Sequence, residues 1–376
     1  MHTNLSRFFL ILFGVLGALV LAIGLRYGGG EHFPDRSGAP ELPASTLEVV
    51  ANLDLPPGNI AVSASGRIFF SFHPEAKPPV NVAELVDGKP VPYPAQLPDG
   101  VQYQSVLSLR VDRQNRLWVL DNAHHGTGAP RLLAFDLATN TLVHRHDFTS
   151  DIAGIGSHLN DFQVRADGNM IYIAEASIFA KNPALVIYDV EKQTARRVLE
   201  GHDSVVADYF TPVVQGRRML MLGIFAIRPG VDSIALSRDG EWLYFAPVTD
   251  DKLWRIRREL LDDPALDTTT LAQSVQPYFP KTMSDGITTD DAGNVYLSDA
   301  DNSAIVLLTP QGQLRTLLKD DKLRWPDGFS FGPDGWLYVT CSALHQVIMK
   351  DGDFVRQHAP YQIFRFRPEV AAVAGH

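Results

Sequence analysis

Short apolar runs alternate with turn signals along most of the chain, and one pattern occurs six times. Each copy has an apolar strand, a tight turn that closes on Gly or Asn, and a second strand that carries an aromatic residue. The copies begin at Gly58, Leu107, Asn160, Asp232, Asp285 and Asp327. Their turn residues are Gly66, Asn115, Gly168, Gly240, Gly293 and Gly335, spaced 49, 53, 72, 53 and 42 residues apart. Gly and Asn are the residues that a turn with positive φ requires, so we expect six equivalent hairpins.

Further strand candidates follow several copies: RLLAFDLATNTLVHRHDF, ALVIYDVEKQTARRVL, KLWRIRR and AIVLLTPQGQLRTLL. Each unit then holds about four short strands, and a repeated four-stranded unit of ~40–50 residues is typical of a propeller blade. We therefore predict an all-β, six-bladed β-propeller over residues 46–368. The ring must close, because an open stack leaves a sheet edge exposed. Either LEVVANL near residue 48 or PYQIFRFRP near the C-terminus supplies the closing strand.

Two stretches fall outside the repeat. Residues 257–275 (RRELLDDPALDTTTLAQSV) have a helical pattern, and we expect a helix there between blades four and five. The longest gap between turns contains residues 205–227, which we interpret as an elaborated loop and an outer strand.

The N-terminus carries an unbroken uncharged run, FFLILFGVLGALVLAIGL, from Phe8 to Leu25, with Arg7 before it. As a helix this run spans roughly 27 Å, close to the hydrocarbon thickness of a bilayer. An uncleaved anchor is favoured over a signal peptide cut after Ala22, and in both cases the rest of the chain is exported. We assign residues 1–30 to this anchor or signal, and residues 31–45, rich in Gly and Pro, to a linker.

The composition narrows the class of partner. The chain has 376 residues, 45% of them hydrophobic, and a formal net charge of −10. Such a charge argues against nucleic acid as a partner and against an anionic membrane surface for the soluble part. We expect an extracytoplasmic protein that meets the membrane through its N-terminal helix alone. The single cysteine, Cys341, lies in an apolar run and is interpreted as a buried hydrophobe.

The first residues of the six copies form a set that we call the ring positions. Equal register places them around one mouth of the central channel, where four of them offer side-chain oxygens: Asn160, Asp232, Asp285 and Asp327. Asp161 and Asn59 lie beside ring positions and add to the set. Hard oxygen ligands from several directions suit a divalent metal, Ca²⁺ first and then Mg²⁺ or Mn²⁺. An organic cation such as an amine satisfies the same ring, and a purely structural role in holding backbone N–H groups is the alternative.

Acids inside the turns, Asp112, Asp239 and Asp334, are assigned to turn chemistry instead. His124 and His125 follow the second strand of blade two. Because consecutive side chains point apart along a strand, we expect at most one of the two to line the site, and we select His124 as a ligand-binding candidate.

The amino-acid sequences of several segments, and their order along the chain, are specific to one family. DSIALSRDGEWLYFAPVTDDKLWRIRRELLDD, with PGNIAVSASGRIFFSF, RLWVLDNA, ALVIYDVE and HLNDFQV, resembles the Yellow/major royal jelly protein family in its bacterial form. The resemblance covers residues 46–350. It implies a six-bladed propeller, export, and in some members a small amine bound in the central channel; some insect members are implicated in dopachrome conversion.

The blades resemble the regucalcin/gluconolactonase family more distantly, which implies a divalent metal at one channel mouth. Asp285 then matches a metal-binding Asp, Asp232 stands where that family has an Asn, and Asn160 matches a metal- or substrate-facing Asn. Blade one departs from this pattern, since PPGNIAV offers Asn59 and no Glu.

Three functions follow from these resemblances and from the ring. The first is a small-molecule-binding propeller. The second is a metal-dependent lactonase, esterase or isomerase with Asp285 as its catalytic residue. The third is a protein-interaction scaffold, which an exposed apolar patch on one rim would favour.

Overall fold

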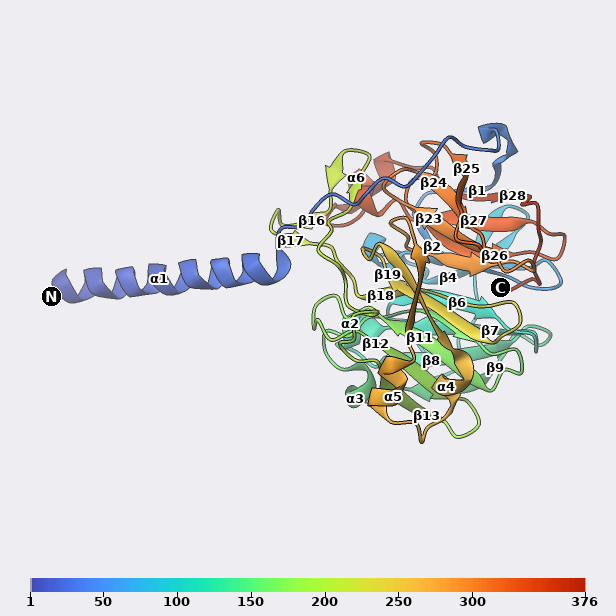
Figure 1. Ribbon diagram of the computed structural model, residues 1–376, viewed down its shortest axis with the longest axis horizontal. Helices are drawn as coiled ribbons and strands as arrows, with labels where there is room; N and C mark the ends of the chain where they lie inside the picture. The colour runs from blue at the N-terminus through green and yellow to red at the C-terminus, as the bar shows by residue number, and fades with distance from the viewer. Residues whose placement is uncertain (1, 376) are drawn as a thin grey trace.

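Six four-stranded antiparallel sheets form a closed ring in the computed structural model, which describes residues 2–375 (Figure 1). Blade one comprises β2 (Pro57–Val62), β3 (Ile68–Phe72), β4 (Val82–Val86) and β5 (Lys89–Pro92), and blade two comprises β6 (Val106–Val111), β7 (Arg116–Asp121), β8 (Arg131–Asp136) and β9 (Thr141–Asp147). Blade three comprises β10 (Leu159–Val164), β11 (Met170–Glu175), β12 (Ala184–Asp189) and β13 (Thr194–Val198), and blade four β18 (Val231–Leu236), β19 (Trp242–Pro247), β20 (Lys252–Arg257) and β21 (Gln276–Pro280). Blade five comprises β22 (Ile287–Thr289), β23 (Val295–Asp299), β24 (Ala304–Leu308) and β25 (Leu314–Lys319). The predicted six-bladed propeller is confirmed.

Blade six is built from both ends of the propeller. Its inner strands are β26 (Pro326–Phe331) and β27 (Leu337–Cys341), followed by β28 (Tyr361–Phe366), and its outer strand is β1 (Glu48–Leu53). The two segments proposed as alternatives for ring closure therefore act together: β1 pairs with β28 in antiparallel register from Glu48 opposite Arg365 to Leu53 opposite Tyr361.

Local sequence sets the hairpins as expected. All six turn residues of the repeat have positive φ, from 61° at Asn115 to 85° at Gly66. The first strands of successive blades contact one another around the whole circle, so they line the central channel. Apolar faces of neighbouring blades then pack against each other in six buried clusters, one at each blade boundary. The hydrophobic core thus consists of six interfaces between neighbouring sheets, arranged in a ring, rather than of one central cluster.

Two expectations about the insertions are wrong. The helical stretch lies within blade four, between β20 and β21, and consists of two short helices, α4 (Arg258–Asp262) and α5 (Thr268–Gln273). Pro264 explains the break, because the residue before a proline is driven out of helical geometry; Asp263 has φ −81° and ψ 107°. Residues 205–227 form no outer strand but two small ribbons, β14 (Val213–Val214) with β15 (Arg217–Arg218) and β16 (Leu220–Met221) with β17 (Phe225–Ala226).

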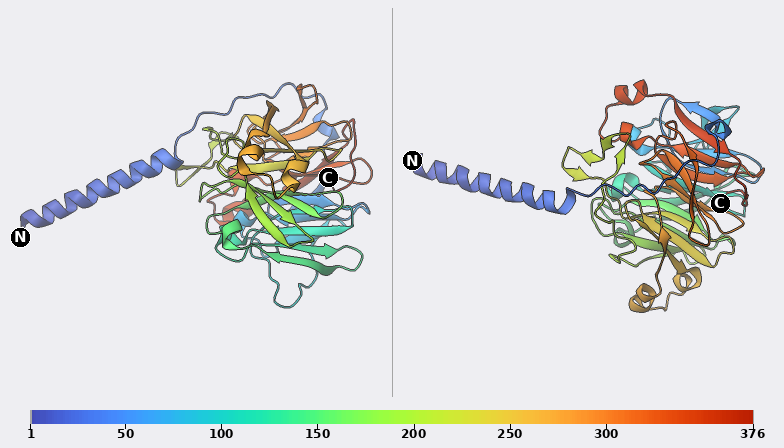
Figure 2. Two further views of the ribbon diagram at one scale, coloured as in Figure 1. Left: turned by 60° about the horizontal axis from the view of Figure 1, so that its bottom comes forward. Right: turned by 45° about the horizontal axis from the view of Figure 1, so that its top comes forward.

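Short helices decorate the loops: α2 (Ala123–Gly126), α3 (Ser150–Ala153) and α6 (Gly352–Gln357). The apolar N-terminal helix, α1 (His2–Tyr27), projects away from the propeller, and its segment from Arg7 to Tyr27 is long and apolar enough to span a membrane (Figures 1 and 2). A signal sequence would satisfy the same criterion.

The segment predicted as a linker is docked on the propeller rather than free. Glu31 forms a parallel bridge with Phe210, and Phe33 is 3% exposed within an apolar cluster that includes Trp325 and Leu344. Farther along, the backbone N–H of Leu42 donates to the carbonyl of Leu317 on β25 at 2.9 Å. Residues 31–42 therefore form part of the folded body.

Candidate functional site

A cavity of about 570 Å³ opens at one mouth of the central channel, which we call the site mouth. All six ring positions line it: Gly58, Leu107, Asn160, Asp232, Asp285 and Asp327. Asn59 and Asp161 line it as well, so the equal register inferred from the sequence brings the predicted set together. Asp161, Asp232 and Asp285 are buried, each at most 8% exposed, and Asn160 and Asp327 are partly buried.

A repeated irregularity turns these side chains toward the cavity. In five blades the pairing of the first two strands shifts register at the ring position, as between Val231 and Ser233 around Asp232. Such a bulge redirects side chains and leaves backbone N–H groups without a ladder partner. In blade five, Asp285 precedes β22, and the Ser298 hydroxyl accepts the N–H of Asp285 at 2.8 Å and of Gly286 at 3.2 Å. Ser71 and Thr340 serve blades one and six in the same way.

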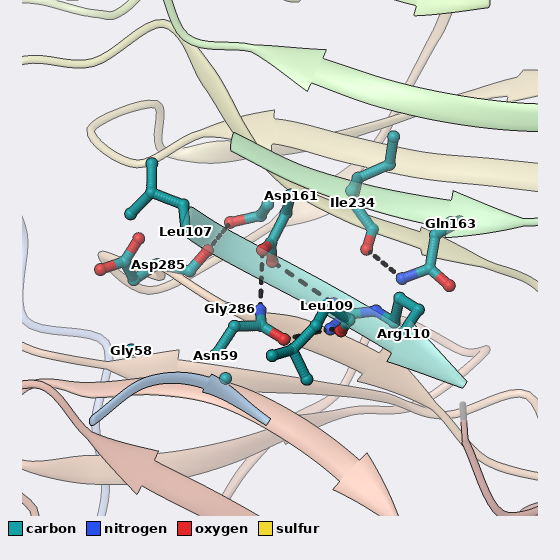
Figure 3. A network of polar contacts seen from close by, with 12 residues as sticks. Gly58, Asn59, Leu107, Leu109, Arg110, Asp161, Gln163, Ile234, Asp285 and Gly286 are labelled. Atoms are coloured by element: carbon teal, nitrogen blue, oxygen red, sulfur yellow. Dashed lines mark hydrogen bonds and ion pairs between the residues drawn. The ribbon is translucent and has the colours of Figure 1, made fainter. Parts of the chain in front are cut away.

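The buried guanidinium group of Arg110 links two residues at the floor of the cavity, Asn59 and Asp161. The Arg110 guanidinium donates to Asn59 Oδ1 at 2.5 Å and lies 3.5 Å from Asp161 Oδ2, while Asn59 Nδ2 donates to Asp161 Oδ1 at 2.8 Å (Figure 3). These three residues come from blades two, one and three. Arg110 is 4% exposed and lines a second cavity, of about 480 Å³, at the opposite mouth of the channel, whereas its partners Asn59 and Asp161 line the first. The Arg110 contacts therefore connect the two ends of the channel.

On the opposite side of the floor, the Trp325 indole N–H donates to Asp285 Oδ2 at 2.5 Å. The fully buried ammonium group of Lys281 donates to the carbonyls of Val248 and Thr282 and lies near enough to favour ionisation of Asp285. The indole thus fixes the direction of the Asp285 carboxylate.

Burial of these acids, together with their proximity to one another, raises their pKa values. Burial, followed by the charges of Asp285, Asp161 and Asp327, raises the pKa of Asp232 well above its ordinary value. Burial and the charges of Asp285 and Asp161 do the same to the pKa of Asp327. Burial raises the pKa of Asp285 to about 6, against the opposing hydrogen bond from Trp325. Any added positive charge in this cavity would favour the ionised forms.

Above the floor the walls are largely apolar, with Trp325, Phe179, Met221, Leu344 and Ile348 among the lining residues. Imidazoles occupy one side, where His158 Nδ1 and His125 Nδ1 lie 2.7 Å apart. Burial lowers the pKa of His158 and of His125, so both imidazoles are neutral at physiological pH.

The expectation that at most one of His124 and His125 lines the site is wrong, since both do. Ala123, His124 and His125 all have positive φ, between 50° and 57°, so this segment is a left-handed turn in which strand alternation does not apply. His124 itself is exposed at the rim, while His125 is half-buried.

The donor types at the ring fit a hard cation, since carboxylate and amide oxygens are what Ca²⁺ prefers. Their spacing is a separate matter. Within residues 2–375, the acids whose oxygens lie within 4.8 Å of one another as a group of three are Asp208, Asp250 and Asp251, outside the ring positions. The Arg110 guanidinium already supplies positive charge beside Asp161. In the part of the chain that the structure describes, therefore, no three acids of the ring form such a group.

The sequence argument missed Arg110 and Trp325. Arg110 had a detectable signal: the residues five before each turn residue are Ala61, Arg110, Gln163, Ala235, Thr288 and Ser330, all buried, and only one is charged. Trp325 had none, because its contact with Asp285 joins two blades across 40 residues of sequence.

Solved structures of similar fold support the architecture. A luciferin-regenerating enzyme superimposes with a TM-score of 0.56 at 14% identity, over 88% of this chain and 97% of that one. Regucalcin from Agrobacterium tumefaciens, described as a calcium-binding protein, gives 0.54 at 17% identity over 86% and 94%. A gluconolactonase from Xanthomonas campestris gives 0.55 at 13% identity over 90% and 98%. At these identities the likeness extends to the fold alone.

Sequence relatives are nearer. Major royal jelly protein 3 of Apis mellifera is 27% identical over 230 residues, which cover 57% of this chain and 40% of the relative. Major royal jelly protein 1 of the same species is 26% identical over 194 residues, or 46% and 42%. The chain thus spans less than half the length of these curated relatives. A family model described as major royal jelly protein matches residues 104–364, and the resemblance inferred from the sequence is confirmed. This chain belongs to the major royal jelly protein family.

Proposed function

We propose that the protein is an exported propeller that binds a small amine or phenolic molecule in the cavity at the site mouth. One observation carries the proposal: Asp161, Asp232, Asp285 and Asp327 meet at the floor of a single cavity, with one guanidinium beside them. The apolar helix from Arg7 to Tyr27 supports export, as an anchor or as a signal.

The two parts of such a ligand have matching surroundings. An ammonium group at the floor would meet Asp285 and Asp232, where burial strengthens a charge-assisted hydrogen bond. An attached aromatic ring would lie against the apolar wall that includes Trp325 and Leu344. A cavity of about 570 Å³ falls in the range of sites for small molecules.

Calorimetry with tyramine and with tyrosol, its uncharged counterpart, tests this proposal. We expect tyramine to bind and tyrosol to bind more weakly. Asp285→Asn should weaken tyramine binding by about 1.5–3 kcal/mol, or roughly 10- to 100-fold, through loss of a charged acceptor. The matched control is Asp334→Asn, which removes one carboxylate from an exposed turn outside the cavity. Equal affinities for the two ligands, or equal losses in the two variants, would refute the proposal.

A second candidate is a metal-dependent enzyme in which Asn160, Asp232, Asp285 and Asp327 hold a divalent ion. An ion would supply charge stabilisation to a lactone, ester or dopachrome-like substrate, and Asp285 is the candidate catalytic residue, with its carboxylate held in the ionised form by the ion. The lack of a Glu in PPGNIAV, the segment that opens blade one, weighs against lactone hydrolysis. Metal analysis of the purified full-length protein with and without Asp285→Asn separates the candidates: a stoichiometric ion lost in the variant favours the enzyme.

A further inference from the structure

Several large apolar side chains are exposed together on the loops around the site mouth. We call this set the apolar rim: Ile155 (84% exposed), Leu222 (71%), Tyr209 (58%), Met349 (56%), Phe179 (47%) and Ile224 (44%). They come from four separate loops. Exposed apolar side chains that gather on one face mark an interaction surface.

The apolar rim is continuous with the cavity. Phe179 belongs to both, Leu222 follows the cavity residue Met221, and Met349 follows the cavity residue Ile348. Ile155 joins the set through its neighbour Gly156, whose carbonyl accepts the N–H of Ala180. Whatever covers the rim therefore also faces the entrance of the cavity.

The N-terminal helix is attached to this same rim. The Tyr27 hydroxyl donates to the Phe179 carbonyl at 3.4 Å, and the Tyr27 ring packs on Phe225 with centroids 5.8 Å apart. Just beyond the helix, the Arg228 guanidinium donates to the Gly28 carbonyl at 2.8 Å. Figure 1 shows α1 leaving the propeller on the side that carries β16, β17 and α2.

The length of the connection decides how near the rim lies to the end of the apolar helix. The uncharged run ends at Leu25, two residues before the contact made by Tyr27, a distance of roughly 3 Å along a helix axis. No flexible spacer intervenes, since residues 28–31 are themselves bonded to the ribbon segment through Thr211 and Tyr209. A helix that spans a bilayer would therefore hold the rim at the bilayer surface.

Charge around the rim agrees with this placement. Arg26, Lys181 and Arg218 lie at the junction of α1 with the propeller, where Arg218 donates to the Gly30 carbonyl and Lys181 lies over the Tyr27 ring. The chain as a whole carries −10. A local group of cations beside exposed apolar residues is the composition that binds at a lipid headgroup boundary.

We propose that the apolar rim rests on the lipid bilayer that contains α1, so that the cavity opens toward the membrane surface. A protein partner would also cover an apolar patch, but the direct attachment of the helix to the rim favours lipid. Small molecules that partition into the headgroup region then reach the cavity without crossing bulk solvent.

Site-specific labelling of the full-length chain in vesicles tests the proposal. Leu222→Cys and Ile155→Cys place an environment-sensitive fluorophore on two loops of the rim, and Cys341 is buried and should not react. Arg113→Cys, exposed at the opposite mouth, is the matched control, and Leu16→Cys in α1 reports insertion. The vesicles contain phosphatidylcholine and phosphatidylglycerol, with nitroxide lipids that quench at a depth of about 5–10 Å.

We expect blue-shifted emission and lipid quenching at both rim positions, and neither at position 113. Aqueous emission at the rim while position 16 is quenched would overturn the proposal. A blue shift at the rim without lipid quenching would assign this face to a protein partner and overturn it equally. Neither result depends on whether an amine binds, because no ligand is present.

Discussion

At the scale of single residues, the carboxyl group of Asp285 is held in the cavity at a cost in folding stability. Its carboxyl is 8% exposed, accepts one hydrogen bond from Trp325, and has a pKa raised by burial to about 6. Because the folded state then holds a proton that the unfolded state releases near its ordinary value of 3.8, stability falls as pH rises from about 4 to about 6. Above pH 6 this contribution is constant and unfavourable.

Asp285→Asn should therefore raise stability at pH 7.5. A shift of about two pKa units corresponds to about 3 kcal/mol, and the amide keeps an oxygen that the Trp325 N–H can contact. Urea unfolding of the full-length protein at pH 7.5 and pH 4 checks this, with Asp334→Asn as the exposed control. The gain should shrink toward zero at the lower pH; a loss of stability at pH 7.5 would show that the carboxylate is held favourably.

At the scale of elements, the hydroxyls of Ser71, Ser298 and Thr340 replace missing ladder bonds beside the ring positions. These three residues occupy the same place in their blades, five after the turn residue. The other three blades have Leu120, Ile173 and Phe245 there, all fully buried. The geometry of the cavity floor thus depends on one polar position in the second strand of three blades.

Ser298→Ala should cost about 1–3 kcal/mol of stability, because two buried N–H groups lose their acceptor, and it should weaken ligand binding by displacing Asp285. Ser298→Thr is the matched control. It retains the hydroxyl group, and blade six has a threonine, Thr340, at the equivalent position. Denaturation and calorimetry on both variants check the effect. Equal behaviour of the two variants would mean that the hydroxyl is not needed to position Asp285.

The sequence repeat was sufficient to predict most of the fold but only part of the candidate site. Turn residues with positive φ recur at regular spacing, so six blades and six ring positions were predictable from Gly66, Asn115 and their equivalents. Contacts between blades have no such period. The bond from Trp325 to Asp285, the left-handed turn at His124 and the docking of Phe33 depend on the assembled ring, which local patterns do not encode.

At the scale of the whole molecule, net charge and cavity act together. The chain carries −10, and Asp285, with a pKa of about 6, is ionised at neutral pH in a cavity whose walls are largely apolar. Such an arrangement focuses the electric field and raises the encounter rate of cations.

The association rate of tyramine should therefore fall by about tenfold as the salt concentration is raised from a low value to the physiological value or above, because screening weakens the electrostatic attraction. Stopped-flow measurement of tryptophan emission is suitable, since Trp325 lines the cavity. Tyrosol, which carries no charge, provides the comparison. A rate for tyramine that does not change with salt would exclude steering by the acidic field.

The composition of blade six has a consequence for biosynthesis. Because β1 begins at Glu48 and its partner β28 ends at Phe366, the last blade has no complete sheet until nearly the entire chain has left the ribosome. Five blades can assemble in order as they emerge, but the first and sixth meet only at the end. In a nascent chain that passes through a translocation channel, blade six would therefore remain incomplete during transit. The ring would close only on the far side, where folding no longer blocks passage.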